Sequence, residues 1–182
     1  MAKIIIYDFT VILELLFLFS FIAYWVYLIY SDLKGSPFVP TKSKNIERIL
    51  KMADIKKGSN FYELGCGDGR VTRLAVTKFG VKGFGVDVNP ILIWFANLVS
   101  RFKKLKHISF KTKNIFDTAL KDANVVYLFL MPKLIDKMSD KLMKELKKKT
   151  IIISHGFKIP KLKSQLYKTL SDEPYPTYYY RL

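Results

Sequence analysis

The stretch FYELGCGDGR, from Phe61 to Arg70, places three alternating glycines directly after a short apolar run. A buried strand that turns sharply into a helix needs residues that accept positive φ and let other groups approach the backbone, and glycine does both. The residues that follow, 71–79, repeat apolar side chains at helical spacing. The stretch therefore predicts a strand, a tight glycine turn and a helix.

Strands and helices alternate along the rest of the chain. After a first strand over 60–64, we expect strands over 82–88, 107–112, 125–130 and 150–154, and helices over about 90–102 and 133–149. Asn89 and Pro90 supply an N-cap and a proline at the first helical position. Two more strands, over 162–170 and 175–182, flank the turn SDEP and are expected to form an antiparallel pair at the edge. The pattern predicts an α/β fold with a mostly parallel, seven-stranded sheet and helices on both faces, whose ligands bind beyond the carboxyl ends of the strands.

An apolar segment precedes this domain. Residues 11–30 read VILELLFLFSFIAYWVYLIY, with Glu14 as their one charge. A helix of that length spans about 30 Å, the thickness of a bilayer's hydrocarbon core, so we expect one transmembrane helix in contact with the lipid bilayer. A helix buried against the soluble domain is the alternative. Only Lys3 precedes the segment, whereas several lysines and arginines follow it (Lys34, Lys42, Lys44, Arg48 and Lys51), so the domain is expected to face the cytoplasm or an equivalent reducing compartment.

Three parts follow from these patterns. Residues 1–31 are expected to be the transmembrane anchor, 32–57 a proline-containing linker with a lead-in helix, and 58–182 the main domain. Thr41 is a suitable N-cap for the lead-in helix, and its apolar residues fall at helical spacing (Ile46, Ile49, Leu50 and Ala53).

The composition limits the partners. A formal net charge of +16 at pH 7 would attract anionic partners such as nucleic acid or acidic lipid headgroups, although a solvated, lysine-rich surface explains it equally well. The single cysteine, Cys66, excludes an intrachain disulfide, and with only two histidines no metal site of the usual Cys/His kind is expected.

The glycine turn and the acids around it indicate a nucleoside site. Arg70 stands where the dinucleotide fingerprint requires its third glycine, and no lysine followed by serine or threonine closes the loop, so neither NAD nor a nucleoside triphosphate is expected. Asp87 ends the second strand, where a carboxylate can accept hydrogen bonds from both ribose hydroxyls. Asn114 and Ile115 follow the third strand and offer an amide and an apolar surface to an adenine. Tight turns in an unspecific α/β domain are the alternative.

Three motifs, ELGCGDG, VDVNP and KNIFD, resemble those of class I S-adenosylmethionine-dependent methyltransferases, over about residues 60–154. The resemblance implies S-adenosylmethionine as the cofactor. It places Glu63, Gly65, Gly67 and Asp68 at the methionine end, Asp87 at the ribose, and Asn114 with Ile115 at the adenine. The complete implied cofactor-binding set is Glu63, Gly65, Cys66, Gly67, Asp68, Gly69, Asp87, Val88, Asn114, Ile115 and Thr41.

A narrower resemblance rests on GSPFVPT, residues 35–41, placed between the apolar segment and the glycine turn, and on a fourth strand that ends in Met131 and Pro132. This arrangement is similar to the membrane-anchored lysine methyltransferases that modify the ATP synthase c-subunit and the adenine nucleotide translocase. It implies methyl transfer to a lysine of a membrane protein. The substrate-facing residues that it implies are Pro37, Phe38, Pro40, Met131 and Pro132, and no catalytic base is nominated. A stiff spacer is the alternative for the proline stretch.

Other activities stay open. An RNA methyltransferase would explain the basic charge, but Met131 and Pro132 replace the acid or amide, two prolines and aromatic residue that nucleic-acid amine methyltransferases carry, so nucleic acid is not the expected partner. A lipid or quinone methyltransferase at the membrane is the better alternative. The apolar run ILIWF, residues 91–95, is expected to pack between the sheet and a neighbouring helix rather than to touch lipid or a partner.

Overall fold

The computed structural model describes residues 2–34, 43–171 and 174–182, and the chain divides into two compact units, Met1–Pro37 and Phe38–Leu182. The first unit contains one helix, α1 (Ala2–Lys34). Within this helix the stretch Tyr7–Trp25 has a mean hydropathy of 1.7 and none of it is buried, so its length and composition suit a membrane span. This stretch overlaps the segment 11–30 that is expected from the sequence to cross a bilayer.

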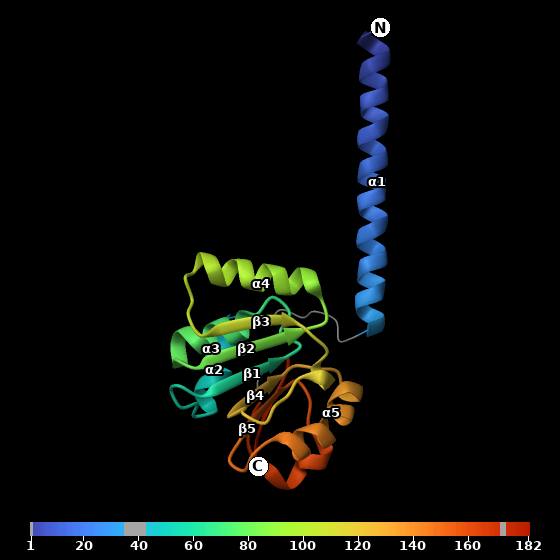
Figure 1. Ribbon diagram of the computed structural model, residues 1–182. Coiled ribbons are helices and arrows are strands. Elements are labelled where there is room, and N and C mark those ends of the chain that lie inside the picture. Colours follow the sequence, from blue (N-terminus) through green and yellow to red (C-terminus); the bar gives the residue numbers. More distant parts are fainter. Residues whose placement is uncertain (1, 35–42, 172–173) are drawn as a thin grey trace. The chain divides into compact units, whose positions relative to one another are not determined.

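The second unit is built on a seven-stranded sheet (Figure 1), with the order β3-β2-β1-β4-β5-β7-β6. Strands β1 to β5 all run parallel to one another, and β7 runs antiparallel to both β5 and β6. The bounds are β1 (Asn60–Leu64), β2 (Lys82–Asp87), β3 (Ile108–Thr112), β4 (Val125–Leu128), β5 (Ile151–His155), β6 (Leu166–Leu170) and β7 (Thr177–Arg181). The expected mostly parallel sheet and its antiparallel edge pair are confirmed.

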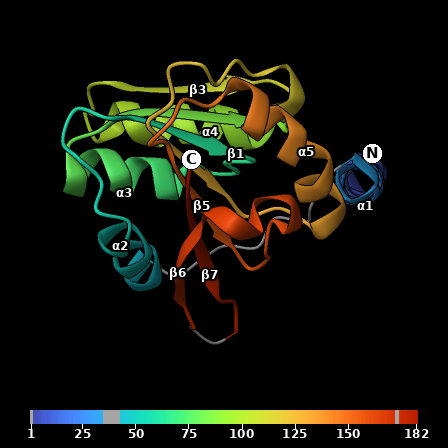
Figure 2. The ribbon, with the colours of Figure 1, turned by 90° about the horizontal axis from the view of Figure 1, so that it is seen from below.

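Helices cover both faces of this sheet (Figure 2). They are α2 (Ser43–Met52), α3 (Arg70–Phe79), α4 (Pro90–Phe102) and α5 (Pro132–Glu145), with 3₁₀ helices η1 (Ile115–Asp117) and η2 (Pro160–Gln165). Side chains of α2 and α3 pack with Phe61 and Tyr127 in one core cluster, whereas those of α5 and η2 pack with Leu64 and Leu128 in another. Because successive residues of a strand point to opposite faces, each central strand contributes to both clusters.

Several element ends differ from the expected ones, and three of these differences are informative. Strand β4 ends at Leu128, where its partner Leu64 is the last residue of β1 before the glycine turn leaves the sheet. Helix α5 ends before Leu146, whose backbone is extended and whose side chain is buried in the core. The segment 162–170 begins in η2, which has a proline at its start, and only its second half is a strand. For β4, the partner available to the backbone, rather than the apolar run, determines the end.

The expected amphipathic helix ahead of the sheet is present as α2, and Ile46, Ile49 and Leu50 are completely buried on one side of it. Its last turn is also held by hydrogen bonds, since the Tyr179 hydroxyl donates to the Ile49 carbonyl at 3.0 Å. The Lys168 ammonium donates to the Met52 carbonyl at 3.1 Å. Thr41, expected to cap this helix, lies outside the described residues.

Candidate functional site

The glycine turn connects β1 to α3 at the carboxyl edge of the sheet. Gly65, Gly67 and Gly69 have φ values of 77°, 53° and 74°, the left-handed region that favours glycine. The amides of Gly65 and Cys66 both donate to the Val86 carbonyl at 2.9 Å, which fastens the turn to the end of β2. A Cβ on Gly69 would lie 2.4 Å from the Phe110 ring, so this glycine is required for packing and not only for the approach of a ligand.

Asp87 stands where three turns meet. One carboxylate oxygen accepts from the Gly67 amide at 2.8 Å and the other from the Asn89 amide at 2.9 Å, while its carbonyl accepts from the Lys113 amide. A carboxylate offers about four lone-pair sites, so acceptor capacity for two further donors remains on this group. Its position suits the expected role at two ribose hydroxyls.

Glu63 has a partner inside the fold. Its buried carboxylate accepts from the Thr72 amide at 2.9 Å and from the Thr72 hydroxyl. Gly69, the N-cap of α3, has no side chain that could bond to the first turn, so Glu63 supplies that cap from the neighbouring strand. Burial raises the pKa of Glu63 to about 8, against the lowering effect of the Thr72 hydrogen bonds and with a smaller contribution from Asp68 and Asp87. Its role at the methionine end of a cofactor stays a prediction.

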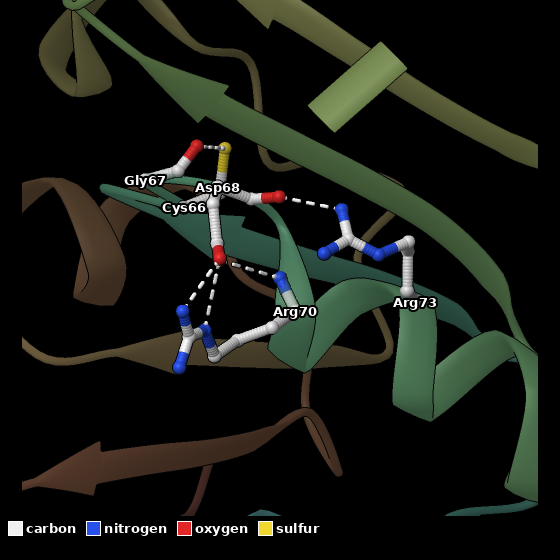
Figure 3. Close-up of polar contacts among 5 residues, drawn as sticks. All are labelled: Cys66, Gly67, Asp68, Arg70 and Arg73. Carbon is white, nitrogen blue, oxygen red and sulfur yellow. Dashed lines mark hydrogen bonds and ion pairs between the residues drawn. The ribbon is translucent and has the colours of Figure 1, made fainter. Parts of the chain in front are cut away.

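Two arginines hold Asp68 (Figure 3). Arg70 Nη2 lies 2.7 Å from Asp68 Oδ2, and Arg70 Nε lies 3.0 Å from each carboxylate oxygen. Arg73 donates to the Asp68 carbonyl. From the sequence, Arg70 is expected only to obstruct dinucleotide binding. The structure instead gives both guanidinium groups a part in fixing the turn, and the sequence signal for it is a pair of arginines three residues apart at the start of α3.

The thiol of Cys66 points into the domain. It packs with Ile93, Ala96 and Phe110, and burial raises its pKa well above the usual range. A neutral, enclosed thiol is a poor nucleophile. Cys66 therefore offers a ligand its backbone alone.

The remaining residues of the expected cofactor-binding set divide into two groups. Val88, which follows β2, is exposed, and Asn114, which follows β3, is exposed and caps η1 by accepting from the Phe116 amide at 3.0 Å. Ile115 is buried in the core cluster beneath α5, which leaves little of its side chain for an adenine.

The described residues that are expected to face a substrate follow the end of β4. Met131 and Pro132 are exposed at the start of α5, and their role toward a substrate stays a prediction. Pro37, Phe38, Pro40 and Thr41 lie outside the described residues.

A group of aromatic rings lies at the ends of β4 and β5, and the sequence patterns do not predict it. The Phe129 ring centroid lies 4.6 Å from that of His155 and 5.3 Å from that of Tyr175. His155 Nδ1 is 2.9 Å from the Thr177 hydroxyl, which fixes the imidazole within this group. These rings come from three separate segments that only the sheet order brings together, so no local pattern in the sequence reveals them.

A metal centre is not formed by the residues that the structure describes, since no group of three or more His, Cys, Asp or Glu side chains among them is arranged to hold an ion.

Comparison with known proteins gives consistent relatives. The model of the ANTKMT methyltransferase domain matches residues 63–166. A protein-lysine N-methyltransferase of Saccharolobus islandicus is 36% identical over 126 residues, which cover 68% of this chain and 78% of that protein. The human ATP synthase c-subunit lysine N-methyltransferase and the mouse adenine nucleotide translocase lysine N-methyltransferase are each 29% identical, over 68% of this chain. The chain spans about half the length of these two, 53% and 54%.

A solved structure extends the likeness to the fold. The RNA methyltransferase of Salinibacter ruber, in complex with S-adenosyl-L-homocysteine, superimposes with a TM-score of 0.74 at 27% identity. The match covers 79% of this chain and 93% of the other. Together with the strand order, it confirms the class I methyltransferase fold.

Proposed function

The chain belongs to the ANTKMT methyltransferase domain family, and we propose that it methylates a lysine side chain of a membrane protein. S-adenosylmethionine is its cofactor, as in the methyltransferases that it resembles. The observation that carries the proposal is the 36% identity to a protein-lysine N-methyltransferase over 78% of that protein's length. The human and mouse relatives, named for the c-subunit of ATP synthase and for adenine nucleotide translocase, support an acceptor of this kind.

The residues at the carboxyl edge of the sheet fit this cofactor. Asp87 keeps two acceptor sites beyond its bonds to Gly67 and Asn89, as ribose hydroxyls require. The left-handed glycines at 65 and 67 have no Cβ, so a ligand can approach the main chain of the turn that follows β1, next to the end of β2, where the methionine end is expected.

The cofactor supplies an activated methyl group on a sulfonium, so the protein needs chiefly to align the acceptor amine with it and to keep that amine neutral. The protein supports the second task by desolvation, since an apolar environment lowers the pKa of an ammonium group. Met131 and Pro132, with the rings of Phe129 and Tyr175, would provide that environment. Pro37, Phe38, Pro40 and Thr41 would cover the methionine end of the cofactor, and no side chain is assigned as a general base.

Membrane attachment belongs to the same proposal. Residues 1–31 would anchor the chain by a single span, residues 32–57 would connect it, and residues 58–182 would carry the reaction on the cytoplasmic side. The unburied, apolar stretch Tyr7–Trp25 of α1 supports the anchor, and the excess of lysine and arginine after it supports the orientation. A membrane-embedded acceptor would then be presented within the plane to which the enzyme is tethered.

Two observations favour a second function. The Salinibacter structure is of an RNA methyltransferase, and a net charge of +16 suits a polyanion. Against it, β4 is followed by Phe129, Leu130 and Met131, without the acid or amide that an exocyclic base amine needs as an acceptor. Methylation of a lipid or quinone is the remaining alternative.

A labelling experiment separates these functions. The purified full chain is incubated with methyl-labelled S-adenosylmethionine, membranes and total RNA, and the protein, organic and RNA fractions are then counted. Label in protein, recovered as methyl-lysine after hydrolysis, is the expected result. Label confined to the organic fraction would replace the proposal with lipid or quinone methylation, and label in RNA would exclude both membrane hypotheses. The Asp87→Ala variant serves as the control for cofactor dependence.

A further inference from the structure

The outer side of α4 has the wrong polarity for a helix that faces water. Ile91, Trp94, Phe95 and Phe102 are 59%, 63%, 43% and 79% exposed. These residues recur at helical spacing and form one stripe, called here the α4 face. The packing expected for the run 91–95 is therefore wrong for three of its five residues, because only Ile93 is buried and Leu92 half-buried.

The polar residues of the same helix point the other way. Ser100 is buried and donates to the Ala96 carbonyl, and the Asn97 amide donates to the Phe110 carbonyl of β3. Before Arg101, these are the two polar side chains of α4, and both are turned toward the sheet. Soluble helices show the opposite arrangement, so the α4 face is built to meet an apolar environment. Among the described elements of the domain, none covers the side of α4 that faces away from the sheet (Figure 1).

Cations surround this face and acids are absent from it. Between residues 88 and 116 the sequence contains no aspartate or glutamate, and its basic residues are Arg101, Lys103, Lys104, Lys106, Lys111 and Lys113, all exposed. Lys103, Lys104 and Lys106 follow the end of α4, whereas Lys113 lies beside its start, because the Lys113 amide bonds to the Asp87 carbonyl. An apolar stripe with aromatic rings and basic residues at both ends matches an anionic bilayer surface, where rings enter the headgroup region and lysines contact phosphate.

We propose that the α4 face docks the methyltransferase domain onto an anionic lipid surface, as a second membrane contact in addition to α1. The inference rests on the proposed anchoring of α1. In the sequence, eight residues separate Lys34 at the end of α1 from Ser43 at the start of α2, and an extended chain of that length reaches about 30 Å at most. A domain tethered so closely must turn one of its surfaces to the bilayer.

This contact would also orient the reaction. Val88 and Ile91 begin the exposed apolar surface directly after Asp87, the residue expected at the ribose. Docking through α4 therefore brings the carboxyl edge of the sheet, where the cofactor and the acceptor lysine are expected, close to the headgroup plane. A lysine that emerges only slightly from a membrane protein would lie within reach of such a site.

The two tryptophans of the chain, Trp25 and Trp94, provide the test. In the full-length Trp25→Phe variant, Trp94 is the single tryptophan, and the protein is reconstituted into phosphatidylcholine vesicles that contain brominated phosphatidylglycerol. We expect strong quenching of Trp94 by the brominated lipid. Replacing Lys103 and Lys104 by glutamine should lower the ratio of docked to undocked domain roughly 30-fold, because each cation near an anionic surface contributes a factor of about five.

A control tryptophan at another exposed position shows whether quenching by the brominated lipid is specific to the α4 face. Met143, on α5, is 43% exposed, the same as Phe95. The full-length triple variant Trp25→Phe, Trp94→Phe, Met143→Trp should show little quenching. Quenching of Trp94 no stronger than in this variant would overturn the proposal. The proposal would also be overturned if Trp94 became shielded from water only after the ATP synthase c-subunit is added to the vesicles. The α4 face would then be a protein-docking surface.

Failure of the anchor and failure of the proposed methylation are seen separately. Trp25, alone in the Trp94→Phe variant, reports whether α1 enters the bilayer, and vesicles in which it stays unquenched would remove the basis of the inference. Neither fluorescence measurement requires methyl transfer. Quenching of Trp94 without labelled protein would leave the docking surface supported and the lysine proposal refuted.

Discussion

The carboxyl group of Glu63 makes the stability of the domain depend on pH in an unusual direction. Burial raises its pKa from 4.5 to about 8 in the folded protein. The folded state then holds a proton that the unfolded state releases, so stability is highest in mild acid and falls as the pH rises from about 4.5 to about 8. With these two values, the free energy of unfolding should decrease by about 3 kcal/mol between pH 5.5 and pH 8.

The Glu63→Gln variant isolates this effect. A glutamine oxygen can still accept from the Thr72 amide and its NH₂ can donate to the Thr72 hydroxyl, so the cap on α3 is kept while the titration is removed. Thermal unfolding of both proteins in the same detergent, from pH 5.5 to 8, measures the difference. A change of about 3 kcal/mol in the free energy of unfolding corresponds to a shift of roughly 6–12 °C in the Tm of a domain of this size. At pH 8 the Tm of the variant should exceed that of the unmodified protein by this amount. Parallel pH profiles for the two proteins would refute the reasoning.

Three further perturbations test other parts of the site and core. Asp87→Ala should weaken S-adenosylmethionine binding, measured by calorimetry, by a factor on the order of 100 or more, since two charge-assisted hydrogen bonds to the ribose are lost; unchanged affinity would mean that the ribose lies elsewhere. Gly69→Ala should destabilise the domain by about 2–4 kcal/mol in thermal unfolding, because its φ of 74° and the Phe110 ring 2.4 Å from the new Cβ both oppose a side chain. Tyr127→Phe should leave the free energy of unfolding unchanged or raise it by about 1 kcal/mol, since the buried hydroxyl has no hydrogen-bond partner among the described residues. Tyr180→Phe removes the acceptor of the Ile159 amide and should lower the free energy of unfolding. Equal effects of the two substitutions would contradict the difference in hydrogen bonding between these hydroxyls.

The main features of the fold follow from local patterns. The glycines at 65, 67 and 69 end β1 and begin α3, and Asn89 with Pro90 begins α4, because these residue types favour such turns and caps in any context. The carboxylate of Asp87 could be placed at the edge of the sheet for the same reason. Ile115 shows the limit, since its neighbour Asn114 is exposed while Ile115 itself lies in the core beneath α5, a difference of tertiary packing.

Three features lie beyond the reach of local patterns. The bond from Thr72 to Glu63 depends on how α3 packs back against β1. The grouping of Phe129 with His155 and Tyr175 depends on which strands are neighbours. The exposure of Trp94 contradicts the expectation from its sequence, because hydrophobicity indicates that a side chain avoids water and does not indicate whether protein or lipid replaces the water.

Helix α2 determines how mechanical load passes into the domain. Its buried residues Ile46, Ile49 and Leu50 join it to α3 and the sheet, and the Ile49 carbonyl is bonded to Tyr179 of a strand 130 positions away in the chain. A pull on the chain ahead of Ser43 would therefore be shared with β7 rather than peel the helix away, because separating α2 exposes the core. The helix is thus part of the packed body of the domain, and a force applied at its start acts on the sheet as well as on α2.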